Sequence, residues 1–212
     1  MREISVVASA DGRDPGAAAA GRRKTVDTTV EHGASAPLSD TTIARARRGD
    51  LAALEAVFRA VEGPVFSLAR RLCGHWQDAE DVLQETFMEV VRSLPRFRGD
   101  CPLPAWVKRV AASKALMRLR AHSRRREAFV EADRIPGRSA PPHDHVGHRV
   151  DLEGALQALT PTARAVVWLH DVEGYTHEEI AELAGRSVSF SKSQLARAHG
   201  RLRECLEPWR EA

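Results

Sequence analysis

Aromatic residues are scarce in this sequence. They make up 5% of its 212 residues, while 43% of the residues are hydrophobic and 29% are charged. Alanine, arginine, leucine and glutamate dominate instead, and these residue types favour helices over sheets. Alternation of apolar and polar residues, the pattern typical of strands, extends over only a few positions. The sequence therefore predicts an all-α protein with enough apolar material for modest cores.

Cysteine and long apolar runs are also in short supply. Cys73, Cys101 and Cys205 are odd in number and far apart, which argues against a disulfide framework and favours a reducing compartment. No apolar run approaches the ~20 residues that a membrane-spanning helix requires. The first residues lack the apolar core of a secretory signal. We therefore expect a cytoplasmic protein that does not insert into a membrane.

Apolar periodicity divides the chain into two helical modules. Residues 1–38 contain no aromatic residue and too little apolar surface to offset chain entropy, so they are predicted to form a disordered leader. Helical spacing occupies residues 39–127 and 150–208. Between them, residues 128–149 are rich in proline, glycine and histidine, which indicates a flexible linker. The expected architecture is two small helical domains, the C-terminal one a helix-turn-helix.

Individual helices can be predicted within each module. In the first, a helix from Asp50 is expected to be interrupted at Gly63-Pro64, because proline suits a first turn and not a helix interior. The following helices are expected at about 64–73, at 76–93, and from Pro102 and Pro104 to about Ser123. In the second module, helices are predicted at 151–159, 161–172, 177–184 and 188–206.

The last two predicted helices form the sharpest local motif. Thr176 and Glu179 have the spacing of a capping box, and Gly185 suits the left-handed turn that ends a helix. A short helix, a turn containing glycine and a basic second helix are typical of a helix-turn-helix, whose second helix enters the major groove. The predicted DNA contacts are Ser189, Phe190, Ser191, Lys192, Gln194, Arg197 and Arg201.

A small helical hairpin with a solvated basic face is the plainer interpretation of this motif. Between Gly185 and Arg203, however, the chain contains no acidic residue. Ile180, Leu183, Val188 and Leu195 are spaced to form the core between the two helices. The missing acids, together with the capped and glycine-turned geometry, favour DNA binding.

Two neighbouring helices of the first module carry opposite charge. Residues 76–93 contain five acidic residues against one arginine, whereas residues 101–126 contain eight lysine and arginine residues and no acid. A basic helix with Trp106 near its start suits nucleic acid, because cations neutralise phosphates and an aromatic ring stacks on a base. The acidic helix would repel DNA, so we expect it to dock on a protein partner.

At these residues the chain resembles a known family. AEDVLQETFMEV at 79–90, PRFRGD at 95–100 and AWVKRVA at 105–111 are similar to the second conserved region of bacterial sigma factors. LTPTARAVVWLHDVEGYTHEEIAELAG at 159–185 and SKSQLARA at 191–198 are similar to the fourth region. With these two regions alone and a short linker, the chain resembles the extracytoplasmic-function group of the sigma-70 family over about residues 39–208.

The resemblance implies a transcription initiation factor with two partners, core RNA polymerase and promoter DNA. Its polymerase-binding residues would be Asp78, Glu80, Asp81, Gln84 and Glu85. The loop 96–104 and the helix after it would capture the non-template strand of the downstream promoter element and help to melt it, through Arg96, Arg98, Trp106, Lys108, Arg109, Lys114, Arg118 and Arg120. The helix 189–201 would bind the upstream element. An anti-sigma protein is a further implied partner.

Two other classes of protein remain to be weighed. A stand-alone helix-turn-helix regulator would bind duplex DNA without polymerase, but the acidic helix beside a basic, tryptophan-bearing one argues against it. An enzyme would need a catalytic or metal site. The linker histidines His143, His145 and His148 could be metal ligands, but they lack a structured second shell. Cys73 and His75 lack the third group that nucleophilic catalysis needs. We predict no catalytic residue, no metal and no cofactor.

Overall fold

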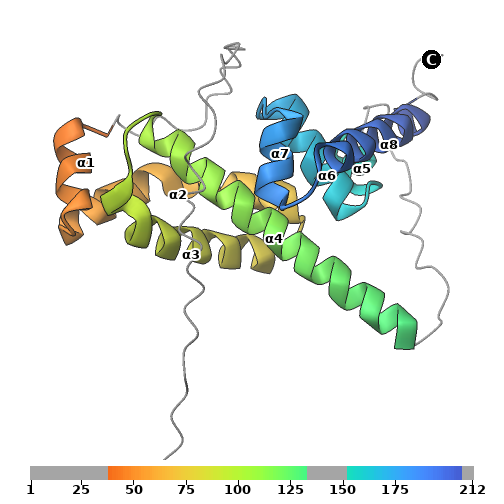
Figure 1. Cartoon of the computed structure of the whole chain (residues 1–212), viewed down its shortest axis with the longest axis horizontal. Helices are drawn as coiled ribbons and strands as arrows, with labels where there is room; N and C mark the ends of the chain where they lie inside the picture. The colour runs from red at the N-terminus through yellow and green to blue at the C-terminus, as the bar shows by residue number, and fades with distance from the viewer. Residues whose placement is uncertain (1–37, 133–151, 207–212) are drawn as a thin grey trace, which may run out of the picture.

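The computed structural model describes residues 38–132 and 152–206, with side chains placed at 38–125 and 154–206. Within these ranges the protein is all-helical, as predicted (Figure 1). The N-terminal module contains α1 (Asp40–Arg47), α2 (Leu51–Cys73), α3 (Trp76–Ser93), a 3₁₀ turn (Leu94–Arg96) and α4 (Leu103–Ala132). The C-terminal module contains α5 (Leu152–Gln157), α6 (Pro161–Val167), a π-helical turn (Trp168–Val172), α7 (His177–Ala184) and α8 (Val188–Leu206). The predicted leader, except for Leu38, and most of the predicted linker lie outside the described residues.

Helix α2 corrects the prediction of a break at Gly63-Pro64. It is one continuous helix with Pro64 inside it. Val57, Val61, Val65 and Leu68 line a single buried face that runs past the proline. Pro64 itself is exposed, so water can satisfy the carbonyl that loses its helical donor. Burial of the shared apolar face outweighs the cost of the proline.

Helix α4 is longer than predicted. It begins at Leu103, with Pro104 in its first turn, and continues to Ala132 rather than ending near Ser123. The residues after Ser123 include arginine, glutamate and alanine, which are strong helix formers, and the next proline is Pro136. The helix therefore extends into the segment that was predicted to be linker.

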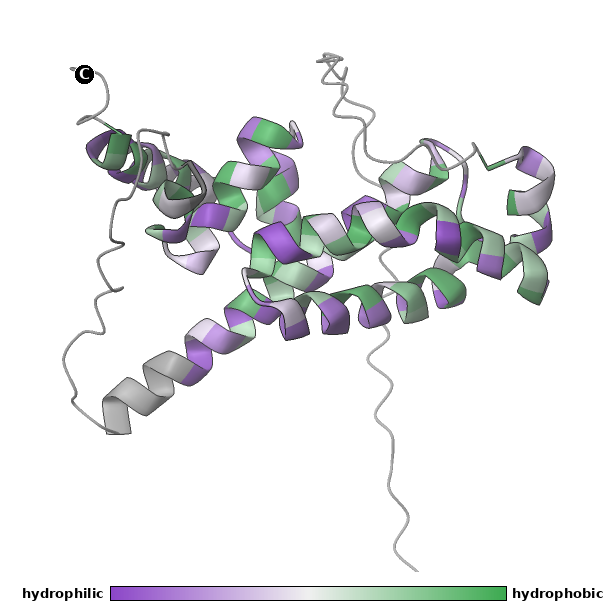
Figure 2. Ribbon diagram, turned by 180° about the vertical axis from the view of Figure 1, so that it is seen from behind, coloured by the Kyte–Doolittle hydropathy of each residue, from purple (hydrophilic) through white to green (hydrophobic). Residues whose placement is uncertain are grey.

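The core of the N-terminal module lies between α2, α3 and α4. Figure 2 shows the apolar residues of these helices turned toward one another and the hydrophilic residues turned outward. The side chains with almost no exposure include Val61 and Leu72 from α2, Val82 and Val90 from α3, and Val107 and Val110 from α4. Each such side chain contributes about 1.5–3 kcal/mol by its removal from water. This packing determines which faces of α3 and α4 remain available for contacts with partners.

The C-terminal module packs against the N-terminal one along α2 and α4. Helix α6 contacts both of these helices, and α7 lies against α4 (Figure 1). Within the module, α8 packs on α6 and α7. The predicted core residues Ile180, Leu183 and Leu195 are buried, and Val188 is half-buried. The basic helix α4 is consequently shared by both modules.

Because Pro64 lies on an exposed helical surface, Pro64→Ala should stabilise the protein. The substitution restores a helical hydrogen bond and removes the clash of the ring with the preceding turn, so the free energy of unfolding should rise by about 1–3 kcal/mol. Urea denaturation followed by far-ultraviolet circular dichroism measures the change. Glu62→Ala, at an exposed neighbouring position, is the control and should stay within about 0.5 kcal/mol of the wild type. A loss of stability in Pro64→Ala would contradict this account of α2.

Candidate nucleic-acid interface

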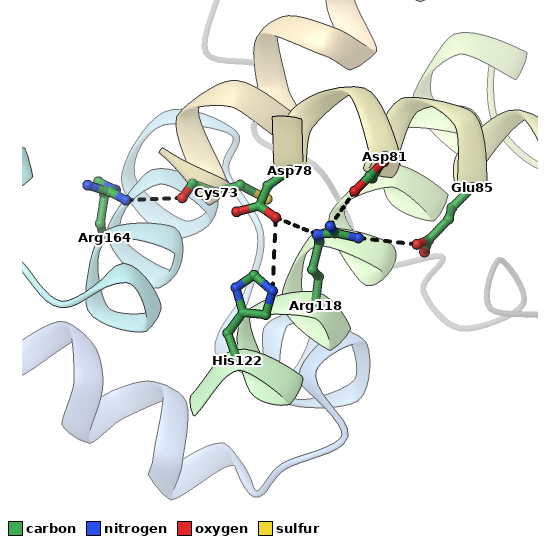
Figure 3. Close-up of polar contacts among 7 residues, drawn as sticks. All are labelled: Cys73, Asp78, Asp81, Glu85, Arg118, His122 and Arg164. Carbon is green, nitrogen blue, oxygen red and sulfur yellow. Dashed lines mark hydrogen bonds and ion pairs between the residues drawn. The ribbon is translucent and has the colours of Figure 1, made fainter. Parts of the chain in front are cut away.

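Three acidic side chains of α3 converge on one arginine of α4 (Figure 3). Arg118 donates from Nε to Asp78 Oδ1 at 2.7 Å, from one guanidinium nitrogen to Asp81, and from Nη1 to Glu85 Oε1 at 3.5 Å. Partial burial lowers the pKa of Arg118, but the carboxylates of Asp78, Asp81 and Glu85 outweigh this effect and leave it raised. Lys114 makes a second link between the two helices, 3.2 Å from Glu89. Arg118 and Lys114 therefore join α4 to α3 within the module.

The five predicted polymerase-binding residues differ in exposure. Glu80 and Gln84 are exposed on α3, and Glu80 accepts a hydrogen bond from Trp76 Nε1 at 2.7 Å. Asp81 and Glu85 have about half of their side chains exposed, at 49% and 48%, whereas Asp78 has 14%. We call these five residues the acidic face. Asp78 mainly holds Arg118, and the other four form a surface that a partner can reach.

Other cations of α4 contact the C-terminal module. Arg109, whose side chain is 10% exposed, pairs through Nη1 with Glu179 Oε1 at 3.1 Å and through Nη2 with Glu182 Oε2 at 2.9 Å. Lys108 Nζ lies 3.1 Å from Glu173 Oε2. Arg120 donates from Nη1 to the carbonyl of Ala184 at 2.9 Å, at the negative end of the α7 dipole. We call this set of contacts the module interface.

The C-terminal end of α2 adds a second part to the module interface. Arg71 places its guanidinium 4.4 Å from the centre of the Trp168 ring, within cation–π range. Arg164 donates from Nη2 to the carbonyl of Cys73 at 3.4 Å, as Figure 3 shows. Burial raises the pKa of the Cys73 thiol to about 12, so Cys73 is an inert core residue and not a nucleophile.

The loop before α4 lies beside a hollow. Arg96 and Arg98 are exposed, as a DNA-contacting role requires. The hollow, of about 490 Å³, is lined by α1 and by the loop, including Phe97 and residues 99–103. Trp106, by contrast, is 3% exposed and its ring lies 5.1 Å from that of Phe97. In this arrangement the buried ring of Trp106 cannot stack on a base. Its contact with DNA stays a prediction.

The helix-turn-helix is built as its sequence indicates. Thr176 and Glu179 form both hydrogen bonds of the capping box, and Gly185 adopts φ of 57°, where a side chain would be strained. Along α8, four of the predicted DNA contacts are exposed, two are half-buried and one is buried. The exposed ones are Ser189, Lys192, Arg197 and Arg201, the half-buried ones Phe190 and Gln194, and the buried one Ser191.

Some contacts between distant residues were not predicted from the sequence. Glu173, Glu179 and Glu182 hold the cations of α4, and no local pattern pairs residues that lie 65 or more positions apart. Ser191 was predicted to contact a base, but its buried hydroxyl lies 3.0 Å from His177 Nδ1. A histidine near a buried hydroxyl becomes visible only once α7 and α8 are placed in space.

Comparisons with known proteins identify the family of this chain. The family model Sigma-70 region 2 matches residues 57–125, and Sigma-70, region 4 matches residues 149–202. The chain is 34% identical over 164 residues to the RNA polymerase sigma factor CarQ of Myxococcus xanthus, covering 76% of this chain and 94% of CarQ. The chain belongs to the extracytoplasmic-function sigma factors of the sigma-70 family.

The chain is also similar to a second curated sigma factor and to a solved structure. The ECF RNA polymerase sigma factor SigE of Mycolicibacterium smegmatis is 36% identical over 168 residues, which cover 74% of this chain and 64% of SigE. Among solved structures, the sigma factor RpoE in complex with the anti-sigma factor NepR from Bartonella quintana is 24% identical with a TM-score of 0.49, covering 72% of this chain and 96% of RpoE.

Family membership determines the general function of this sigma factor. It binds core RNA polymerase and promoter DNA and directs transcription initiation, and the family is not one of enzymes. A stand-alone helix-turn-helix regulator is accordingly set aside. The linker histidines lie outside the described residues. Over the described ranges, no helix is both long and apolar enough to span a bilayer.

The module interface yields a direct prediction. Glu179→Gln with Glu182→Gln removes two charges that pair with Arg109, while the amide oxygen introduced at position 179 can still accept the capping hydrogen bond from the backbone of Thr176. Loss of these two ion pairs leaves a mostly buried cation with less compensating charge, so the module interface should weaken and the modules should separate more readily. Small-angle X-ray scattering should show a larger radius of gyration, by several ångströms, on the scale of a small domain's own radius.

The matched control is Glu178→Gln, which removes one charge from an exposed position of the same helix. Its scattering curve should coincide with that of the wild type. If the double variant also keeps the wild-type curve, the ion pairs of Arg109 do not hold the modules together.

Proposed function

We propose that the two charged surfaces of the N-terminal module divide the work of initiation. The acidic face of α3 docks on a basic surface of core RNA polymerase, while the loop 96–104 and α4 receive the downstream promoter strand. This division rests on one observation: Glu80, Asp81, Gln84 and Glu85 are reachable on α3, beside an α4 whose described side chains from Lys108 to Arg125 include no acid. Surfaces of opposite sign select partners of opposite sign.

The loop and the hollow beside it suit a single DNA strand. Arg96 and Arg98 are exposed on either side of Phe97 in the sequence and can neutralise phosphates, and Phe97 lines the hollow. A volume of about 490 Å³ is large enough for one unstacked base. Capture of such a base shifts the equilibrium toward melted DNA, which is how this surface would contribute to promoter opening.

The basic side of α4 serves two partners that cannot be bound together. Lys108, Arg109 and Arg120 are engaged with the C-terminal module. The same cations would contact the promoter strand, so the promoter-bound form requires the module interface to separate. Core polymerase would favour that separation by contacting the two modules at separate places, because only the open form can make both contacts at once.

Helix α8 would bind the upstream promoter element as duplex. Lys192, Arg197 and Arg201 are exposed and suit phosphate contacts, and Ser189 and Gln194 lie at the start of the helix, where base edges are reached. The protein would act in the cytoplasm, where polymerase and promoters are. An anti-sigma partner, which the resemblance implies, stays a prediction for this chain.

Reversing charge on the acidic face tests the docking assignment. Asp81→Lys with Glu85→Lys should lower the affinity for core RNA polymerase at least tenfold, because it places two cations against a basic surface. The fold should persist, because Asp78 still holds Arg118 at 2.7 Å. Co-elution with core polymerase on size-exclusion chromatography measures binding, and circular dichroism checks the fold.

Glu55→Lys with Glu62→Lys is the matched control, since it makes the same change of charge at exposed positions on α2. This variant should bind core polymerase as the wild type does and support transcription from the same start site. Wild-type affinity in the α3 variant would overturn the assignment of the acidic face.

A further inference from the structure

A chain of polar contacts connects three elements of the C-terminal module. In the π-helical turn, Asp171 Oδ1 lies 2.8 Å from His170 Nδ1, and its Oδ2 lies 2.7 Å from Nε2 of His199 on α8. The ring of His170 stacks on that of His177, the first residue of α7, with ring centres 4.6 Å apart. His177 Nδ1 in turn lies 3.0 Å from the hydroxyl of Ser191 on α8.

This arrangement holds α8 at two points. Ser191 is fully buried in the first turns of the helix, and His199 lies two turns further on. Ser191 is close in the sequence to Ser189, Phe190 and Lys192. These three residues are predicted to contact DNA. A shift of Ser191 would therefore move the side chains on the opposite, exposed side of the same turns. The contacts consequently determine the angle at which α8 is presented.

We infer that His177 is a positioning residue that sets the pose of α8 for duplex recognition through its hydrogen bond to Ser191 and its stacking on His170. The inference rests on the proposed binding of α8 to the upstream element. Among the described residues, no group of histidine, cysteine and acidic side chains is arranged to hold a metal ion. The cluster acts through hydrogen bonds and ring packing.

Protonation of His177 should disturb this arrangement. The charged or titratable groups around it are His170 and Asp171 of the π-helical turn, Lys192 of α8 and Glu178 of α7, with His199 of α8 on the far side of Asp171. Toward α4, the acids Glu179 and Glu182 are already engaged by Arg109. A positive charge on His177 would therefore lie close to the cation of Lys192.

The direction of the pH effect follows from two pKa shifts. Burial, followed by His170 and Lys192, lowers the pKa of His177 below 6.5 despite Glu178 and Asp171. Burial raises the pKa of Asp171, but hydrogen bonds from His199 and His170 outweigh it and leave it lowered. The assembled cluster thus prefers a neutral His177 and a charged Asp171. The contribution of His177 is complete above the unfolded pKa of histidine, about 6.5, and is lost as the pH falls from there through the lower folded pKa. Asp171 stays charged over this range, because its pKa is lowered from 3.8.

Binding of the holoenzyme to promoter DNA across pH tests this inference. The probe is a promoter fragment found by run-off transcription of host genomic DNA, compared with the same fragment carrying a scrambled upstream element. The measured quantity is the ratio of the two affinities, from pH 5.5 to 8.5. His177→Ala and Ser191→Ala remove the hydrogen bond. His177→Asn keeps an amide near the position of Nδ1 but cannot titrate, and His75→Gln, at an exposed position before α3, is the control.

At pH 8, His177→Ala and Ser191→Ala should lower the affinity ratio by roughly five- to tenfold, the range expected for one lost hydrogen bond. His177→Asn should restore most of it. The wild type and His75→Gln should lose roughly two- to fivefold between pH 7.5 and 5.5, whereas His177→Asn should lose much less. A purely structural role would not make the pH profile depend on this residue.

Each remaining outcome overturns the inference in a distinguishable way. If His177→Ala discriminates as the wild type does, or if His177→Asn keeps the wild-type pH profile, His177 does not position α8. If the wild type itself does not discriminate between the two fragments at pH 8, the proposed binding of α8 to the upstream element fails, and the inference fails with it.

Discussion

The arrangement of the two modules depends on the ion pairs that the guanidinium of Arg109 forms. Its neighbours on α4, Val107 and Val110, are buried in the core of the N-terminal module, which fixes the position of Arg109, and with the C-terminal module docked its side chain is 10% exposed. A buried cation without a partner is strongly unfavourable. The partners come from α7, through Glu179 and Glu182. Docking of the second module thus satisfies a charge that belongs to the first.

The cations of α4 are divided between two neighbouring acidic elements. Arg118 and Lys114 face α3, and Lys108 and Arg109 face the C-terminal module. DNA phosphate is a third possible partner for the same side chains. In the proposed function, one helix therefore carries the competition between a closed protein and a promoter-bound one. The competition is set by ion pairs that salt and partner binding can shift.

Several helix boundaries were predictable from local signals. The capping box at Thr176 and the glycine at 185 placed α7 correctly, and α3 occupies the predicted residues. The expected break at Pro64 was wrong because the apolar face of α2 continues past it, a fact that only the packed core reveals. The length of α4 was underestimated, because the sequence between Ser123 and Pro136 contains no helix breaker that would mark its end.

The candidate site was predictable in charge but not in contacts. Alternating acidic and basic helices indicated the two surfaces, and the family resemblance named their residues. Burial of Trp106 and Ser191, and the pairing of Arg109 with α7, depend on how distant segments pack. No spacing in the sequence reports such contacts. The polar cluster around His177 was missed for the same reason.

A distance between the modules, measured with and without polymerase, tests the central claim most directly. Cys101 and Cys205 are half-exposed free thiols, one in each module, while the buried Cys73, with its pKa raised to about 12, resists labelling. Paired dyes on these two thiols of the native protein should give a defined energy transfer in the free state. Adding core RNA polymerase should lower it sharply as the modules separate. Equal transfer in both states would contradict the claim that α4 exchanges the C-terminal module for DNA.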